Sequence, residues 1–343
     1  PPPPPPPPPL FQAEDGIRDV LLSLVGSEMC IRDSYLSRAL VSYFPVPLQR
    51  RYEDLMAEHR LAREIIATAL TNSLVNRMGP VFAYRTRDET GADVASVARA
   101  YTIAREVFNV RSLWQAIENL DNQVHANTQY SMMSRTTRLL KHGTHWFLDR
   151  TALIDDIAAA VQRFGPAARK LVVGTAEFLT GREYKRFEDA RALYTDIGIP
   201  DDVARVMAGL HSLHSALDII EVAEHTDADV LFVAAIYFRL GEALEVDWLR
   251  DQVERLSVEG RWQAMARNSM RENLYFLQGQ ITQQVLEVAG RRPPDKALAD
   301  WSEARADRLT HVHDTISEMR AQGQMDFATL GVALQEIRRL IQV

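Results

Sequence analysis

Residues 89–120 form the first copy of an internal repeat and read ETGADVASVARAYTIAREVFNVRSLWQAIENL. They align without gaps, at a constant offset of 136, with residues 225–256, which read HTDADVLFVAAIYFRLGEALEVDWLRDQVERL, and twelve of the 32 positions are identical. Both copies open with Thr-x-x-Asp, which has the form of a helix N-terminal capping box with Asp in place of Glu or Gln. Each copy is therefore predicted to be a capped helix, a break near Asn109 or Glu245, and a second helix.

A helix pair of this kind leaves one apolar face uncovered, so we predict that the two copies pack face to face and bury both faces. The alternative is a coincidence between two amphipathic helix pairs. The shared opening motif and the paired Tyr101 and Tyr237 argue against a coincidence.

The rest of the chain also carries apolar residues at helical spacing, which predicts an all-α, multi-helix bundle. Helices are expected at Leu48–Met78, Val94–Phe108, Arg111–Leu120, Thr128–Leu148, Leu153–Phe164, Glu183–Ile197, Asp201–Leu210, Leu213–Glu224, Val230–Leu244, Asp247–Leu256, Trp262–Val288, Asp295–Met319 and Phe327–Leu340. Only Val81–Tyr84 has the pattern of a strand, and one short strand makes no sheet. Turns are predicted near Gly165–Pro166, Gly198–Pro200 and Pro293–Pro294. None is long enough for a domain linker, so we expect one compact unit with a loosely attached C-terminal hairpin.

The first 34 residues differ from the rest of the chain. Pro1–Pro9 can adopt only a polyproline II conformation, which has no internal hydrogen bonds. The runs QAEDGIRD at Gln12–Asp19 and LVGSEMCIRDS at Leu24–Ser34 resemble sequencing-adapter DNA translated in frame. Residues 1–34 are therefore predicted to be a disordered artefact, and residues 35–343 a natural helical domain whose own sequence continues upstream. The alternative is a Pro-rich linker followed by a short helix.

The composition argues against several classes of protein. The 343 residues carry a formal net charge of -7, whereas a nucleic-acid-binding protein needs a basic face. The longest apolar run, Val230–Phe238, is far shorter than the roughly 20 residues of a membrane-spanning helix. The single cysteine, Cys30, excludes a disulfide framework and a thiolate metal cluster. We expect a cytoplasmic protein that binds neither nucleic acid nor a membrane.

The common motifs of nucleotide binding and hydrolysis are absent from the sequence. No two glycines are separated by a single residue, which excludes the G-x-G-x-x-G dinucleotide turn, and there is no Gly-Lys-Ser/Thr of a P-loop. The motifs H-E-x-x-H and G-x-S-x-G do not occur either. We therefore predict no catalytic, cofactor-binding or metal-binding residues in this chain.

Histidine pairs are the remaining candidates for a metal site. They are His142 with His145, His211 with His214, and His311 with His313. A spacing of three places the first two pairs on one helix face each, and Asp218 could join His211 and His214 as a third ligand. No thiolate or paired Glu-x-x-His motif supports coordination. We therefore expect polar surface residues at these positions.

Two acidic pairs and the tryptophans also have a structural interpretation. Asp155–Asp156 and Asp201–Asp202 stand where helices are predicted to begin, so they are expected to interact with helix dipoles rather than to catalyse proton transfer. The tryptophans lie within helical patterns and are expected to be core or interface anchors. They are Trp114, Trp146, Trp248, Trp262 and Trp301.

Four runs of sequence carry a resemblance to a known family. They are REIIATALTNSLVNRMGPVF from Arg63, ETGADVASVARAYTIAREVF from Glu89, VAAIYFRLGEALEVDWLRDQV from Val233 and RWQAMARNSMRENLY from Arg261. In this order they resemble the C-terminal helical region of the large bacterial NAD-specific glutamate dehydrogenases. The run from Arg63 is the most specific, and the resemblance extends over Tyr35–Val343.

This resemblance implies a parent enzyme that oxidatively deaminates L-glutamate to 2-oxoglutarate and ammonium while it reduces NAD. In that family the substrate lysines and the dinucleotide fold belong to an upstream catalytic domain, so the parent's NAD would be bound outside this chain. The fragment itself would be a non-catalytic structural or regulatory domain. Its partners would be the missing upstream catalytic domain and, in a homo-oligomer, further copies of the chain. The alternatives are a stand-alone helical protein-interaction module and a helical metal enzyme, which rests only on the histidine pairs.

Overall fold

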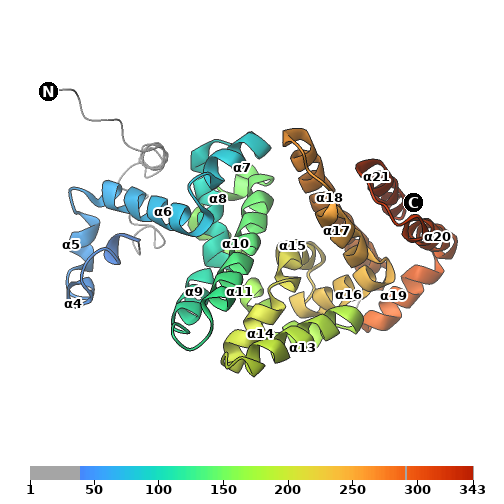
Figure 1. Cartoon of the computed structure of the whole chain (residues 1–343), viewed down its shortest axis with the longest axis horizontal. Helices are drawn as coiled ribbons and strands as arrows, with labels where there is room; N and C mark the ends of the chain where they lie inside the picture. Colours follow the sequence, from blue (N-terminus) through green and yellow to red (C-terminus); the bar gives the residue numbers. More distant parts are fainter. Residues whose placement is uncertain (1–38, 290–291, 343) are drawn as a thin grey trace. The chain divides into compact units, whose positions relative to one another are not determined.

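The computed structural model describes residues 39–289 and 292–342, in which every regular element is a helix and no strand occurs (Figure 1). This confirms the all-α prediction. The artefact predicted for residues 1–34 lies outside the described residues and stays a prediction. None of the described helices combines the length and the apolarity that crossing a bilayer requires.

The described chain forms two compact units, where the sequence predicted one. The first unit contains the described residues up to Asp121 together with His125–Pro166, and the second contains Asn122–Val124 and the described residues from Ala167 onward. Helix α11, Ile157–Val173, runs across this boundary. The boundary between Pro166 and Ala167 directly follows the Gly165–Pro166 pair, but that pair lies inside a continuous helix and is too short for a domain linker, so the sequence pattern did not reveal two units.

The first unit is built around α10, which packs most extensively against α8. Its elements are α4 (Val46–Gln49), α5 (Glu53–Ala57), α6 (Ala62–Met78), α7 (Phe82–Thr90), α8 (Val94–Val107), α9 (Val110–Glu118), α10 (Ala126–Leu148), the 3-10 turn η1 (Thr151–Leu153) and the first part of α11. The rings of Trp146, Phe147 and Phe164 pack edge to face, with centroids 5.1 to 5.6 Å apart. This aromatic cluster packs the first half of α11 against the end of α10.

The second unit is built around α18, against which α15, α16, α17, α19 and α21 pack. Its elements are α12 (Thr175–Phe178), α13 (Gly181–Asp196), α14 (Asp201–Gly209), the 3-10 turn η2 (Ser212–Ser215), α15 (Ala216–Thr226), α16 (Val230–Ala243), α17 (Val246–Arg255), α18 (Arg261–Ala289), α19 (Pro294–Glu303), α20 (Ala306–Gln322) and α21 (Phe327–Arg339). Phe178 and Phe238 stack with centroids 5.3 Å apart, which joins α12 to α16.

The boundaries of α8 and α16 are 136 residues apart, which is the offset of the sequence repeat. Helices α8 and α16 each run for 14 residues and begin directly after the Asp of Thr-x-x-Asp. Asp93 and Asp229 accept hydrogen bonds from backbone N–H groups of the first turns at 2.7 and 2.9 Å. These aspartates are therefore the N-caps, and the threonines are not. Asn109 and Glu245 stand at the breaks with left-handed backbone, at φ 48° and 52°.

The structural repeat is longer than the sequence repeat. Helices α7 and α15 end at Thr90 and Thr226, and each is followed by a left-handed residue, Gly91 or Asp227. Helices α7 and α10 pack on α8, and α15 and α18 pack on α16. The four-helix group α7–α10 thus recurs as α15–α18, with one group in each compact unit. Face-to-face packing of the two copies stays a prediction.

Two of the predicted boundaries are wrong near the start of the described chain. The strand-like Val81–Tyr84 forms the start of α7, with Val81 at the N-cap position, because a short apolar run does not distinguish a helix from a strand. The helix predicted at Leu48–Met78 is divided into α4, α5 and α6. In this stretch Leu48, Leu55 and Leu61 are exposed, so the short helices lack the apolar packing that would hold one continuous helix.

Two further corrections concern turns. Gly165–Pro166 lies inside α11 and not between helices. A proline in a helix removes one hydrogen bond and its ring clashes with the preceding turn, whereas the neighbouring Phe164 and Ala168 are fully buried, which favours continuation of the helix. The helix predicted at Asp295–Met319 is broken between α19 and α20 at Arg305, whose Nε donates a hydrogen bond to Leu340 O at 3.3 Å.

Candidate functional site

The first histidine pair is buried, although the sequence predicted surface positions. His142 and His145 lie on the inner part of α10 with only 4% and 6% of their surface exposed. His145 Nε2 lies 3.2 Å from Glu89 Oε2, and Nδ1 lies 2.8 Å from Lys141 O. The hydrogen bond to His145 lowers the pKa of Glu89 against the opposing effect of burial. This pair therefore belongs to the internal packing of the first unit.

The structure does not assemble His211, His214 and Asp218 into a metal site. The His211 side chain is 47% exposed, and its Nε2 accepts a hydrogen bond from Arg186 Nη1 at 2.9 Å. That bond uses the lone pair that a metal would need, and a nearby guanidinium repels a cation. In the part of the chain that the structure describes, no three His, Cys, Asp or Glu side chains are arranged to hold a metal ion.

The third histidine pair makes separate contacts in the second unit. His313 Nε2 lies 2.7 Å from Ala243 O, and His311 Nε2 lies 3.4 Å from Glu336 Oε2. The two rings therefore do not converge on one point.

The acidic pairs stand at helix starts, as predicted. Asp156 Oδ1 accepts a hydrogen bond from Ala159 N at 2.9 Å in the first turn of α11. Asp201 and Asp202 occupy the first turn of α14, where carboxylates interact favourably with the helix dipole.

The tryptophans divide between the core and the surface. Trp114, Trp146 and Trp301 are buried, which agrees with their prediction as core anchors. Trp262, at the start of α18, is 76% exposed. Trp248 lies under the Arg320 guanidinium, 4.7 Å from the ring centroid.

The most unusual group of side chains in the second unit surrounds Arg250. This Arg250 cluster consists of Glu183 on α13, Tyr237 on α16, Asp247 and Arg250 on α17, and Tyr275 and Gln278 on α18. All are buried except Asp247, which is half-buried. A buried charge is tolerated only when it is paired and hydrogen-bonded, so the contacts of Arg250 decide how this cluster acts.

Arg250 ties α17 to both neighbouring helices. Its Nη1 donates to Asp247 Oδ1 at 3.1 Å, and its Nη2 donates to Tyr237 Oη at 3.3 Å and to Gln278 Oε1. Gln278 in turn donates from Nε2 to Tyr237 O at 2.7 Å. The guanidinium carbon lies 4.1 Å from the centroid of the Tyr275 ring. The Arg250 guanidinium is therefore a buried cation whose charge is balanced by Asp247, and it cross-links α16, α17 and α18.

Glu183 gives the cluster a group that changes charge near neutral pH. Burial raises its pKa to about 7, repulsion from Asp247 adds to this, and Arg186 opposes it. Burial also raises the pKa of Tyr275 to about 12, so this phenol keeps its proton. Shifted pKa values mark candidate functional sites, but structural ion networks produce them too. The contacts of Arg250 with packed helices indicate a structural network.

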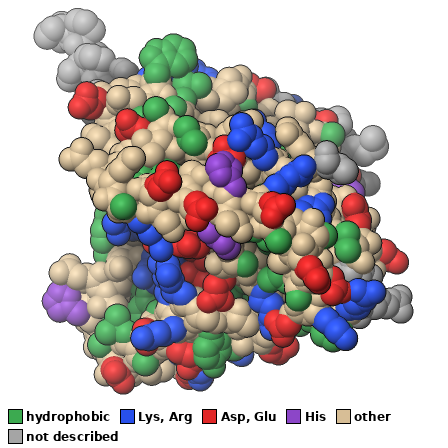
Figure 2. All heavy atoms as spheres, turned by 90° about the vertical axis from the view of Figure 1, so that its right-hand side faces the viewer, with side chains coloured by type: hydrophobic (Ala, Val, Ile, Leu, Met, Phe, Trp, Pro, Cys, Tyr) green, Lys and Arg blue, Asp and Glu red, His purple; other side chains and the backbone are tan. Residues whose placement is uncertain are grey.

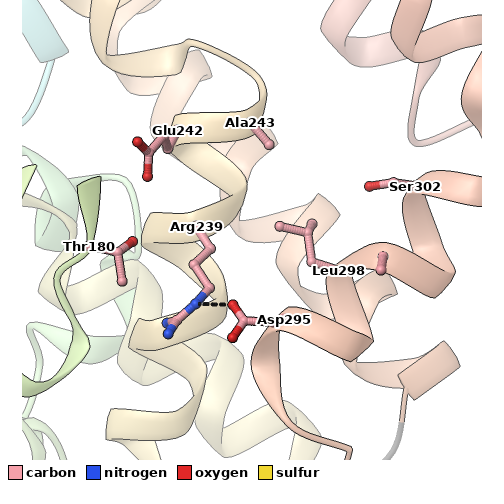
Figure 3. A pocket seen from close by; sticks show the side chains of 8 residues that line it. Thr180, Arg239, Glu242, Ala243, Asp295, Leu298 and Ser302 are labelled. Atoms are coloured by element: carbon pink, nitrogen blue, oxygen red, sulfur yellow. Dashed lines mark hydrogen bonds and ion pairs between the residues drawn. The ribbon is translucent and has the colours of Figure 1, made fainter. Parts of the chain in front are cut away.

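A surface hollow of about 640 Å³ opens beside α16 and α19 (Figure 3). Arg239 and Asp295 point toward each other there, and Arg239 Nε donates to Asp295 Oδ1 at 2.6 Å. The carboxylate of Glu242 lies against Gly181, where an added Cβ would stand 1.9 Å from Glu242 Oε1. Glu242 thus stands at the N-terminus of α13, where a negative charge is favourable. Two carboxylates and one guanidinium leave the hollow with a net negative charge.

The sequence pattern does not predict the Arg250 cluster. Tyr237 is a repeated residue, but Arg250 aligns with Trp114 and so differs between the copies. The available signal was Asp247 three residues before Arg250, a spacing that pairs opposite charges on one helix face. Such pairs are common on solvated helices, so the spacing alone does not reveal burial.

The chain is similar to known proteins over most of its length. It matches the family described as "Glutamate dehydrogenase, C-terminal" over residues 21–339. It is 36% identical over 311 residues to an NAD-specific glutamate dehydrogenase of Pseudomonas aeruginosa and 37% identical over 314 residues to one of Halomonas elongata. A Mycobacterium tuberculosis protein of the same name is 30% identical over 327 residues. These alignments cover 90%, 89% and 95% of the chain, but only 19%, 19% and 20% of the relatives.

Proposed function

The chain belongs to the C-terminal glutamate dehydrogenase family, and on that premise we propose that it is the C-terminal fragment of an NAD-dependent glutamate dehydrogenase. The parent converts L-glutamate, NAD and water to 2-oxoglutarate, ammonium and NADH. The observation that supports this most strongly is the match over residues 21–339, combined with 36% identity to a relative of which the chain spans 19%.

NAD does not fit the described residues of this chain. A dinucleotide fold places the pyrophosphate at a helix N-terminus after a strand and a glycine-rich turn. The described residues form no strand, and the whole sequence has no two glycines one residue apart. The hollow beside Arg239 has two carboxylates, which repel a pyrophosphate. We therefore assign NAD to the part of the parent that precedes this region, and no cofactor to the fragment.

The fragment's own role in this proposal is structural or regulatory. Within each unit the helices of one four-helix group pack together, and in the second unit Arg250 cross-links α16, α17 and α18. Both features support the role of the fragment as a scaffold. On the face in Figure 2, basic side chains lie among acidic ones, so this face offers groups of both signs. The partners that we propose are the preceding catalytic domain and, in a homo-oligomer, further copies of the chain, in the cytoplasm.

The purified chain is expected to be folded but inactive. Given L-glutamate and NAD, it should produce NADH no faster than a buffer blank, because none of its described residues forms a dinucleotide cradle. Circular dichroism of the same sample should give a strongly helical spectrum. Turnover above the blank that scales with the concentration of the chain would overturn the non-catalytic assignment.

A further inference from the structure

The stretch of residues 43–61, which we call the 43–61 segment, carries many exposed apolar side chains. Six large ones are between 38% and 74% exposed, namely Tyr43, Val46, Leu48, Tyr52, Leu55 and Leu61. Within residues 45–61 only Met56 is buried. Single exposed apolar side chains are ordinary on a protein surface, but a group of them in one place marks an interaction site.

The 43–61 segment folds back on itself, so these side chains belong to one small lobe. The rings of Phe44 and His59 meet edge to face with centroids 5.7 Å apart, and Gln49 Nε2 donates a hydrogen bond to Phe44 O at 2.7 Å. Helices α4 and α5 take part in none of the extensive helix pairings of the described chain. In Figure 1 they lie beyond the start of α6, apart from α8 and α10.

The second unit contains a related stretch in different surroundings. Residues 185–193, KRFEDARAL, align without gaps with residues 50–58, RRYEDLMAE, at an offset of 135, and four of the nine positions are identical. The related stretch belongs to α13, a single helix of 16 residues that packs on α14. Its Phe187 is 2% exposed, whereas the aligned Tyr52 is 38% exposed. The aromatic position that is buried in the second unit is therefore open in the first.

Helices as short as α4 and α5 need packing to be stable. They have 4 and 5 residues, whereas isolated helices shorter than roughly 12 to 15 residues are marginal in water. Among the described residues, α4 buries none of its side chains and α5 buries only Met56. The lobe therefore lacks a second surface against which its apolar side chains would be covered.

We propose that the 43–61 segment is the surface on which the domain that precedes this region in the parent polypeptide docks. Apolar side chains of that domain cover Val46, Tyr52 and Leu55. This inference rests on the proposed function, which supplies the parent and its preceding domain.

Two observations select this occupant. The chain spans only 19% of the P. aeruginosa relative and matches a family described as C-terminal, so most of such a relative precedes this region. The polypeptide that enters from there reaches the 43–61 segment before any other described helix. The entropic cost of closing a loop rises with its length, so a preceding domain docks here at less cost than on the second unit. A second copy lacks this covalent advantage.

Photo-crosslinking in the intact P. aeruginosa relative tests the proposal, because that protein contains both the preceding part and the matched region. Benzoylphenylalanine is placed at the position that aligns with Leu55 or, in a control, with Leu193. Leu193 on α13 is the matched control because it is 64% exposed, against 63% for Leu55. Mass spectrometry should show that the Leu55 position crosslinks to peptides from before the matched region, and that the Leu193 position does not.

A substitution tests whether the contact holds the 43–61 segment in place. In the intact relative, glutamate at the position aligned with Leu55 should speed amide hydrogen exchange of the aligned segment by about tenfold or more. Glutamate at the position aligned with Leu193 should change it by less than about twofold. In the 343-residue chain by itself, Leu55→Glu should leave the midpoint of urea unfolding unchanged, because Leu55 is exposed there.

Several results would overturn the proposal. They are crosslinks from the Leu55 position that stay within the matched region or reach only a second copy, no crosslink at all, and equal crosslinking from the Leu193 position. Mixing ¹⁵N-labelled with unlabelled enzyme distinguishes a second copy from the same polypeptide. Unchanged hydrogen exchange in the intact relative, or a lower urea midpoint for Leu55→Glu in the chain by itself, would also overturn it. These failures leave the proposed function standing, because NADH production and truncation of the parent test it separately.

Discussion

Replacing Arg250 with alanine is expected to lower the free energy of unfolding by about 3 to 5 kcal/mol. The substitution removes the partner of Asp247 and leaves the polar groups of Tyr237 and Gln278 without the guanidinium to which they bond. A buried group that loses its hydrogen-bond partner keeps its full desolvation cost. Urea unfolding followed by circular dichroism measures the change.

Arg239→Ala is the matched control for this substitution. Arg239 is also an arginine of the second unit that pairs with an aspartate, but Asp295 is 82% exposed. An ion pair with one partner in solvent contributes about 1 kcal/mol or less. We expect Arg250→Lys to fall between the two, because a lysine keeps the charge but not the planar fork. Equal losses for Arg250→Ala and Arg239→Ala would contradict the role of Arg250 as a cross-link.

Replacing Glu183 with glutamine is expected to stabilise the protein at alkaline pH. The pKa of Glu183 is about 7 in the folded chain against an ordinary value of 4.5 for a solvated glutamate, chiefly because of burial. Between these two pH values the folded state holds a proton that the unfolded state has released. Stability of the unchanged protein therefore falls as pH rises through this window, and Glu183 accounts for a loss of about 3 kcal/mol.

Glu183→Gln abolishes this loss because glutamine does not ionise. The variant should match the unchanged protein near pH 4.5 and exceed its free energy of unfolding by about 3 kcal/mol at pH 8. Glu188→Gln, on the same helix with a 40% exposed side chain, should not alter the pH dependence. A constant difference between Glu183→Gln and the unchanged protein from pH 4.5 to 8 would show that Glu183 does not titrate in this window.

The fold was predictable where short-range patterns decide it. Asp93 and Asp229 cap their helices through backbone N–H groups of the next turn, so the signal lies within a few residues. The continuation of α11 through Pro166 was not predictable in this way, because it depends on burial of Phe164. The same holds for His142, which is buried because other helices cover α10.

The Arg250 cluster could not be predicted from local patterns, because its contacts join residues that are far apart in the sequence. Arg250 bonds to Tyr237 and Gln278, which stand 13 and 28 residues away in sequence. No local spacing predicts which helix faces meet at such a distance.

The central claim is that this region supports a reaction carried out elsewhere in the parent. The most direct measurement removes the matched region from the P. aeruginosa relative and determines glutamate-dependent NADH production and native mass for the truncated and intact enzymes. We expect the truncated enzyme to lose activity, native assembly or both, and the separately purified region to have no turnover. A truncated enzyme with full specific activity and unchanged native mass would contradict the claim.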